Sequence, residues 1–120
     1  MRAGEFQLRS VRKLQQNDII SKGLNDFVSF VDKQSEALLI DELSKIIPGS
    51  SFLAEESGEN NTGSDWTWIV DPLDGTTNYI HGIPLYSVSI CLLNEGKLVL
   101  GVVHEPNLNE TFYAEAGNGA

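Results

Sequence analysis

The amino-acid sequence predicts an α/β (α+β) fold in which two helices precede a set of mainly antiparallel strands. Three observations support this prediction. Apolar residues recur at helical spacing up to residue 47, aromatic and β-branched runs alternate with turns after residue 50, and residues 88–103 contain two apolar runs joined by a short turn. The 120 residues contain no repeat, no low-complexity segment and no linker that would divide them into two domains.

Two helices are expected in the first part of the chain. Residues 3–16 have a helical pattern and carry basic charge. In the second helix, apolar residues repeat at i, i+4, i+7 and i+8, namely Leu39, Leu43, Ile46 and Ile47. Asp32 stands where an N-cap residue would, and Pro48 with Gly49 ends the helix.

The next two strands each end in acidic residues. Residues 52–54 predict a short buried strand that ends at Glu55 and Glu56, and residues 57–65 predict a polar loop. The aromatic and β-branched run 66–70 predicts a second strand that leads directly into Asp71.

The remainder of the chain predicts turns and further strands. Residues 71–75 are expected to form a turn, and residues 76–81 a short helix closed by Gly82. Two strands, 88–93 and 98–103, are expected to form a hairpin, followed by a last strand over 111–116.

Composition excludes several classes of protein. Seventeen acidic and eight basic residues give a net charge of −9, which argues against a nucleic-acid-binding module and against an anionic membrane surface as partner. The single cysteine, Cys91, excludes an internal disulfide, and its apolar neighbours predict a buried, inert thiol. No apolar stretch is long enough to span a bilayer and the N-terminus lacks an apolar signal core, so we expect a cytoplasmic protein.

The acidic residues at the two strand ends predict a cation site. Asp71 and Asp74 lie three residues apart across a turn, and Glu55 joins them if the two strands are neighbours. Three carboxylates this close repel one another unless a cation lies between them. An all-oxygen set, to which the Leu73 carbonyl can contribute, favours Mg²⁺ over Zn²⁺. Because Thr76 adds a hydroxyl and its backbone amide, with that of Gly75, can bind an anion, the pattern points to metal-assisted hydrolysis of a phosphate ester.

Residues 68–78, with the sequence WIVDPLDGTTN, closely resemble the signature of the inositol monophosphatase family of Mg²⁺-dependent, Li⁺-sensitive phosphatases. The likeness covers essentially the whole chain in order, through residues 26–36, 52–58, 81–84 and 117–120. It implies a layered αβαβα sandwich of the inositol monophosphatase and fructose-bisphosphatase type. Family members are more than twice as long, so residues 1–120 are expected to be the N-terminal half of a catalytic domain, inactive on its own.

The resemblance also implies a role for each site residue. The expected Mg²⁺ ligands are Glu55, Asp71, the Leu73 carbonyl and Asp74. The residues expected to bind the substrate phosphate are Leu73, Asp74, Gly75 and Thr76. Catalysis is expected to involve Thr76, Asp32 and Glu55, the first two orienting the attacking water, and Lys22 corresponds to a basic residue near the mouth of the site.

The activity implied by the resemblance is hydrolysis of inositol monophosphate to inositol and phosphate by direct attack of a metal-activated water. Residues 76–78, Thr-Thr-Asn, favour this substrate over bisphosphate nucleotides. A 3′(2′),5′-bisphosphate nucleotidase or a sugar-bisphosphate phosphatase remains an alternative, as does a non-catalytic relative that acts by protein interaction. The expected partner is a small phosphorylated molecule, with a homodimer as a family property.

Overall fold

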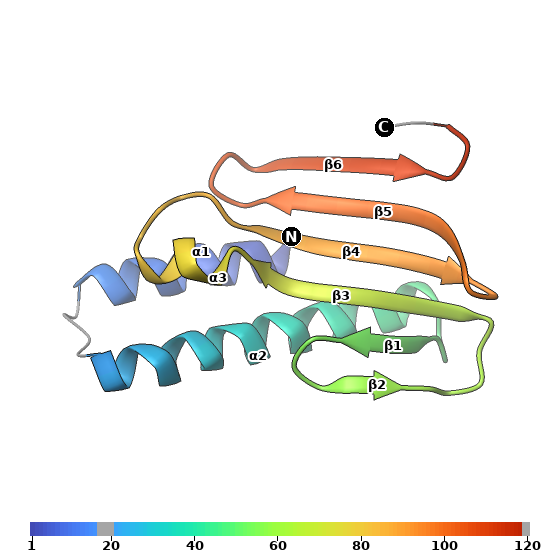
Figure 1. The fold of residues 1–120 in the computed structure, drawn as a ribbon, viewed down its shortest axis with the longest axis horizontal. Coiled ribbons are helices and arrows are strands. Elements are labelled where there is room, and N and C mark those ends of the chain that lie inside the picture. Colours follow the sequence, from blue (N-terminus) through green and yellow to red (C-terminus); the bar gives the residue numbers. More distant parts are fainter. Residues whose placement is uncertain (17–20, 119–120) are drawn as a thin grey trace.

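A computed structural model describes residues 1–16 and 21–118, which form one sheet with two long helices packed against it (Figure 1). The helices are α1 (Arg2–Gln16), α2 (Ser21–Ile46) and α3 (Thr76–Ile80). The strands are β1 (Ser51–Ala54), β2 (Gly58–Asn60), β3 (Trp66–Asp74), β4 (Ser87–Asn94), β5 (Lys97–Glu105) and β6 (Glu110–Glu115). Their order in the sheet is β2-β1-β3-β4-β5-β6, and only β1 and β3 run parallel in the described part. The expected α/β class with mainly antiparallel strands is confirmed.

The second helix is longer than its apolar repeat predicted. It begins at Ser21, so Asp32 lies in the middle of α2, and the expectation that Asp32 is an N-cap was wrong. The reason is that the buried face continues upstream through Val28 and Val31, which are 4% and 0% exposed. The end of the helix is confirmed, since α2 stops at Ile46 and Gly49 adopts a φ of +79°.

Two segments expected to lie outside strands belong to the sheet. Within the predicted loop 57–65, Gly58–Asn60 pairs antiparallel with β1 as the edge strand β2. The predicted turn 71–75 is instead mostly the end of β3, whose pairing with β4 becomes irregular between Asp71 and Asp74. Pro72 accounts for this irregularity, because it has no N–H to donate to a neighbouring strand.

The predicted hairpin, the short helix and the last strand are confirmed as β4–β5, α3 and β6. The hairpin turn uses Glu95 and Gly96, both at positive φ (+50° and +77°), and Gly82 follows α3 at a φ of +71°. None of the helices in residues 1–16 and 21–118 is long and apolar enough to cross a membrane.

The hydrophobic core has two parts, both on the face of the sheet that the helices cover. The larger part joins both helices to the strands through Ala3, Leu39, Leu43, Phe52, Ala54, Trp68, Val70, Val88, Ile90 and Leu92. The smaller part lies where β3 ends, and comprises Val28, Val31, Leu73, Tyr79 and Tyr86. The opposite face is more exposed. Cys91 is half-buried there rather than buried as expected, and Phe112 is 60% exposed.

Candidate functional site

The ends of β1 and β3 bring two acidic residues side by side. Ala54 pairs with Val70 in the parallel ladder, so the next residue of each strand, Glu55 and Asp71, lies at the same edge. The Glu55 N–H donates to the Val70 carbonyl at 3.3 Å, which continues the ladder by one step. Because the carboxyl ends of parallel strands meet, the predicted approach of Glu55 to Asp71 occurs.

The Glu55 carboxyl group titrates far above its usual range. A hydrogen bond to the Asp71 carboxyl group, burial, and the negative charges of Asp71, Asp32 and Glu56 raise the pKa of Glu55 to about 7. A hydrogen bond between two carboxyl groups requires that one of them be protonated. Glu55 therefore gives up its proton less readily than an isolated glutamate, because Asp71 lies beside it.

Asp32 reaches the same cluster from α2. Its side chain is half-buried, and burial is the largest cause that raises its pKa to about 6. The charges of Glu56, Asp71 and Glu36 raise this pKa further. Asp32 is therefore a neighbour of the strand ends rather than a cap of its own helix.

The end of β3 is fixed by a compact set of hydrogen bonds. The Leu73 N–H donates to Asp71 Oδ1 at 3.3 Å, and Thr76 Oγ1 donates to the Leu73 carbonyl at 3.1 Å. The buried Gln7 side chain of α1 donates through Nε2 to the Pro72 carbonyl at 2.6 Å and to Ser35 Oγ at 3.1 Å. Both helices therefore help to hold the segment that carries Asp71.

Gly75 joins this segment to α3 with a backbone that other residues rarely adopt. Its φ is +99°, and a Cβ added there would lie 3.0 Å from the Leu85 carbonyl oxygen and 3.3 Å from Tyr86. Both the conformation and the close approach therefore require glycine. The Gly75 carbonyl accepts the Tyr79 N–H at 3.0 Å, which starts α3 directly after the candidate site.

The structure does not assemble all the expected metal ligands. Asp74 is exposed and contributes to neither raised pKa, and it pairs with Ser87 of β4. Among residues 1–16 and 21–118, no three side chains of Asp, Glu, His or Cys form a group that could hold a metal ion. The oxygen atoms of Glu55, Asp71 and the Leu73 carbonyl nevertheless fit a hard cation such as Mg²⁺ in chemical type. The ligand roles of these residues and of Asp74 stay predictions.

Sequence reasoning assigned no role to two buried polar residues of the helices. Glu36 is 3% exposed and accepts the N–H groups of Glu56 and Ser57, whereas Gln7 is fully buried. Glu36 lies four residues after Asp32 on the same helix, so helical spacing could have placed both on one face. No comparable signal exists for Gln7. The side chain of Lys22 lies outside the residues that the structure describes.

Comparison with known proteins gives a consistent family assignment. A sequence profile of the inositol monophosphatase family matches residues 1–120. An inositol-1-monophosphatase of Mesorhizobium japonicum is 45% identical over 121 residues, which cover 100% of this chain and 46% of that protein. The Nus factor SuhB of Escherichia coli K12 is 47% identical over 100 residues, which cover 82% of this chain and 38% of that protein.

A solved structure extends the likeness to the fold. The crystal structure of the extragenic suppressor protein suhB from Bartonella henselae matches with a TM-score of 0.84 at 42% sequence identity, covering 99% of this chain and 45% of that one. The expected type of fold is therefore confirmed. The chain spans less than half the length of each of these three proteins.

Proposed function

We propose a phosphatase function for this chain, which belongs to the inositol monophosphatase family. The proposed reaction is Mg²⁺-dependent hydrolysis of a phosphate monoester, with inositol monophosphate as the substrate. The observation that carries the proposal is the meeting of Glu55 and Asp71 at one edge of the parallel β1–β3 ladder, where the proximity of Asp71 raises the pKa of Glu55. We also propose that residues 1–120 form part of a larger catalytic domain in a cytoplasmic protein.

The proposed Mg²⁺ ligands are the carboxylates of Glu55, Asp71 and Asp74 and the carbonyl of Leu73. When bound, Mg²⁺ supplies positive charge to the phosphate oxygens and lowers the pKa of a coordinated water. A cation held by Glu55 and Asp71 would stabilise both carboxylates in the charged form and so lower the raised pKa of Glu55.

Thr76 and Asp32 are proposed to orient the attacking water. The Thr76 hydroxyl donates its hydrogen to the Leu73 carbonyl, so its oxygen lone pairs are left to accept a hydrogen bond from water. Asp32, with a pKa of about 6, is mostly ionised at neutral pH and can accept a proton. The backbone amides of Gly75 and Thr76 are proposed to hold the substrate phosphate.

Phosphate release from inositol 1-phosphate, measured across a Mg²⁺ titration, tests this proposal on the purified protein. We expect Asp71→Asn and Asp74→Asn each to lower kcat/KM by about 100-fold or more. Asp65→Asn is the matched control, because Asp65 is an exposed acid just before the opposite end of β3. Full activity in both the Asp71 and the Asp74 variants would reject the assignment.

The substrate is tested by competition among phosphate esters. We expect a higher kcat/KM for inositol 1-phosphate than for a 3′,5′-bisphosphate nucleotide or fructose 1,6-bisphosphate, and the reverse order would favour the alternative phosphatases. Inhibition by Li⁺ and a homodimer in solution are family expectations that the same preparation can test.

A second candidate function is an interaction role, favoured by the likeness to a protein named as a Nus factor. The Asp71→Asn variant distinguishes the two functions, because it removes charge from the proposed metal site without altering the packed core. Loss of hydrolysis with retention of the chain's biological role would favour interaction.

A further inference from the structure

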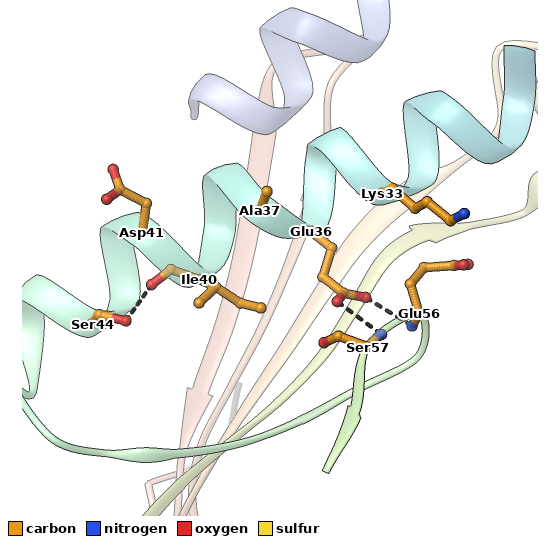
Figure 2. Close-up of a pocket in the computed structure, with 8 residues that line it drawn as sticks. All are labelled: Lys33, Glu36, Ala37, Ile40, Asp41, Ser44, Glu56 and Ser57. Carbon is orange, nitrogen blue, oxygen red and sulfur yellow. Dashed lines mark hydrogen bonds between the residues drawn. The ribbon is translucent and has the colours of Figure 1, made fainter. Parts of the chain in front are cut away.

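The turn that follows β1 is held by a buried carboxylate from another element. Glu36 on α2 is 3% exposed, and its Oε2 accepts the Glu56 N–H at 2.8 Å. Its Oε1 accepts the Ser57 N–H at 3.1 Å. Figure 2 shows both hydrogen bonds running from the helix to the two consecutive amides of the turn.

The chemistry of this contact calls for a carboxylate. Two adjacent backbone N–H groups need two acceptor atoms, and a glutamate presents two equivalent oxygens at the necessary reach. Glutamine would keep one acceptor and turn an NH₂ group toward the second N–H. Hydrogen bonds from N–H groups to a charged acceptor are also stronger than neutral ones, which balances the burial of the Glu36 charge.

The turn held by Glu36 begins at a proposed metal ligand. Glu55 is fixed on its amino side by the hydrogen bond from its N–H to the Val70 carbonyl, and on its carboxyl side by the two amides bound to Glu36. The same helix carries Asp32 one turn earlier, within the electrostatic reach of Glu56 and Asp71. The contact therefore sets the position of the Glu55 backbone relative to both Asp32 and Asp71.

We propose that Glu36 is a positioning residue that keeps the Glu55 carboxylate beside Asp71 and thereby sets the cation affinity of the site. This inference rests on the proposed function, in which Glu55 is a metal ligand. Partners that orient metal ligands typically affect metal affinity or activity by about 10–100-fold when they are changed.

The groove around Glu36 supplies a matched control. It has a volume of about 640 Å³, and Asp41 lines it together with Glu36, Glu56 and Ser57 (Figure 2). Asp41 is exposed, and its carboxylate contacts Lys45 and Arg2 rather than the turn. Asp41→Asn therefore removes one negative charge from the same helix and the same groove and leaves the held amides unchanged.

The test compares Glu36→Gln, Glu36→Asp and Asp41→Asn in the purified protein. Hydrogen exchange of the Glu56 and Ser57 amides is measured in the absence of metal. Binding of Mg²⁺ and of Mn²⁺ is measured by calorimetry, and kcat and KM are measured with inositol 1-phosphate. In Glu36→Gln we expect the rate of amide exchange at these two positions to rise about tenfold, and the metal Kd to rise by a similar factor. We expect kcat to fall by a similar factor while the substrate KM changes less than twofold, and Asp41→Asn to match the wild type.

Glu36→Asp keeps the charge but is one methylene shorter, so it loses part of the contact and should fall between the wild type and Glu36→Gln. If Glu36→Gln does not fold, the same measurements on Glu36→Asp test the proposal. Unchanged exchange and unchanged metal Kd in the Glu36 variants overturn the proposal. A wild-type protein that binds Mg²⁺ without hydrolysing any phosphate ester overturns the proposed function instead, and the exchange and Kd results still decide the role of Glu36.

Discussion

Two segments present acidic residues to the same edge of the sheet. They are the turn after β1 and the irregular end of β3 with Gly75, called the β3 turn below, and they are held in different ways. At the end of β3, Asp71 accepts the Leu73 N–H and Thr76 donates to the Leu73 carbonyl, so these two restraints lie within six residues. After β1, the amides of Glu56 and Ser57 depend on Glu36, which lies 20 and 21 residues earlier in the chain. Restraints that arise within a turn can be recognised in a sequence, whereas restraints that come from another element cannot.

The comparison also identifies what the two turns share. Each receives one buried polar side chain from a helix, Gln7 of α1 for the β3 turn and Glu36 of α2 for the β1 turn. The helices therefore fix both halves of the candidate site relative to one core. We expect substitutions within the β3 turn and substitutions of its helical anchor to have effects of different size.

The largest effect is expected from Gly75→Ala, which would disturb the locally restrained turn. An alanine at φ +99° is strained, and its Cβ would meet the backbone of Leu85 and Tyr86 at 3.0–3.3 Å. We expect the free energy of unfolding, measured with urea, to fall by about 2–4 kcal/mol. Phosphatase activity should fall with it, since Gly75 leads directly into Thr76.

Gly96→Ala is the matched control for this substitution. Gly96 has a φ of +77° in the β4–β5 turn, but nothing lies within 4 Å of an added Cβ. The Gly96→Ala variant introduces backbone strain without a close contact, so we expect its free energy of unfolding to fall by about 1 kcal/mol. Equal losses in both variants would show that close packing at Gly75 contributes nothing.

The second largest effect is expected from Gln7→Met, which would remove the helical anchor of the β3 turn. Methionine has a similar volume, but the carbonyl of Pro72 and the hydroxyl of Ser35 would lose a buried hydrogen-bond donor. We expect the free energy of unfolding to fall by about 1–2 kcal/mol. Gln34→Met, on the exposed side of α2, should change it by less than about 0.5 kcal/mol.

The contrast between the turns explains which features the sequence could predict. The strand into Asp71 and the short helix after Gly75 follow from local signals, namely a β-branched run, a proline and a glycine. The role of Asp32 as an N-cap was wrong because residue type alone does not show where a helix begins. That start depends on the burial of Val28 and Val31 with Tyr79, which lies far away in the sequence.

Two further features escaped prediction for related reasons. The strand β2 consists of a glycine and two polar residues, all exposed, so it has no apolar alternation, and it forms because its backbone pairs with β1. The site roles of Gln7 and Glu36 come from hydrogen bonds to turns 65 and 20 residues away. Polar contacts of this kind depend on tertiary structure and leave no periodic pattern in a single sequence.

A smaller effect is expected from Thr76→Val, which keeps the shape of the side chain and removes its hydroxyl. The Leu73 carbonyl would lose its donor at 3.1 Å, so we expect a loss of about 1 kcal/mol in urea unfolding. Under the proposed function, kcat should fall much further than stability. Thr76→Ser should retain most of the kcat and most of the stability. Thr77→Val, at an exposed position of the same helix, should change neither kcat nor stability.

The smallest effect concerns the pH dependence of stability in the absence of metal. The pKa of Glu55 is raised from 4.5 to about 7 and that of Asp32 from 3.8 to about 6, so both groups bind protons more tightly in the folded chain. These two groups therefore contribute most to stability below their unfolded pKa values, and this contribution is lost as pH rises through the two raised pKa values. We expect the urea midpoint to fall between about pH 4 and about pH 7 at low salt, and only modestly, because Glu55 is exposed and its interactions are screened.

Asp71→Asn should make this decline shallower, because it removes a negative charge that raises both pKa values while its amide oxygen can still accept the Leu73 N–H. Asp65→Asn changes an exposed acid before the opposite end of β3 and should leave the decline as it is in the wild type. Saturating Mg²⁺ should also flatten the decline in the wild type, since a cation stabilises the charged carboxylates that repulsion otherwise penalises. An equally steep decline with and without Mg²⁺ would mean that the two turns do not meet at a cation site.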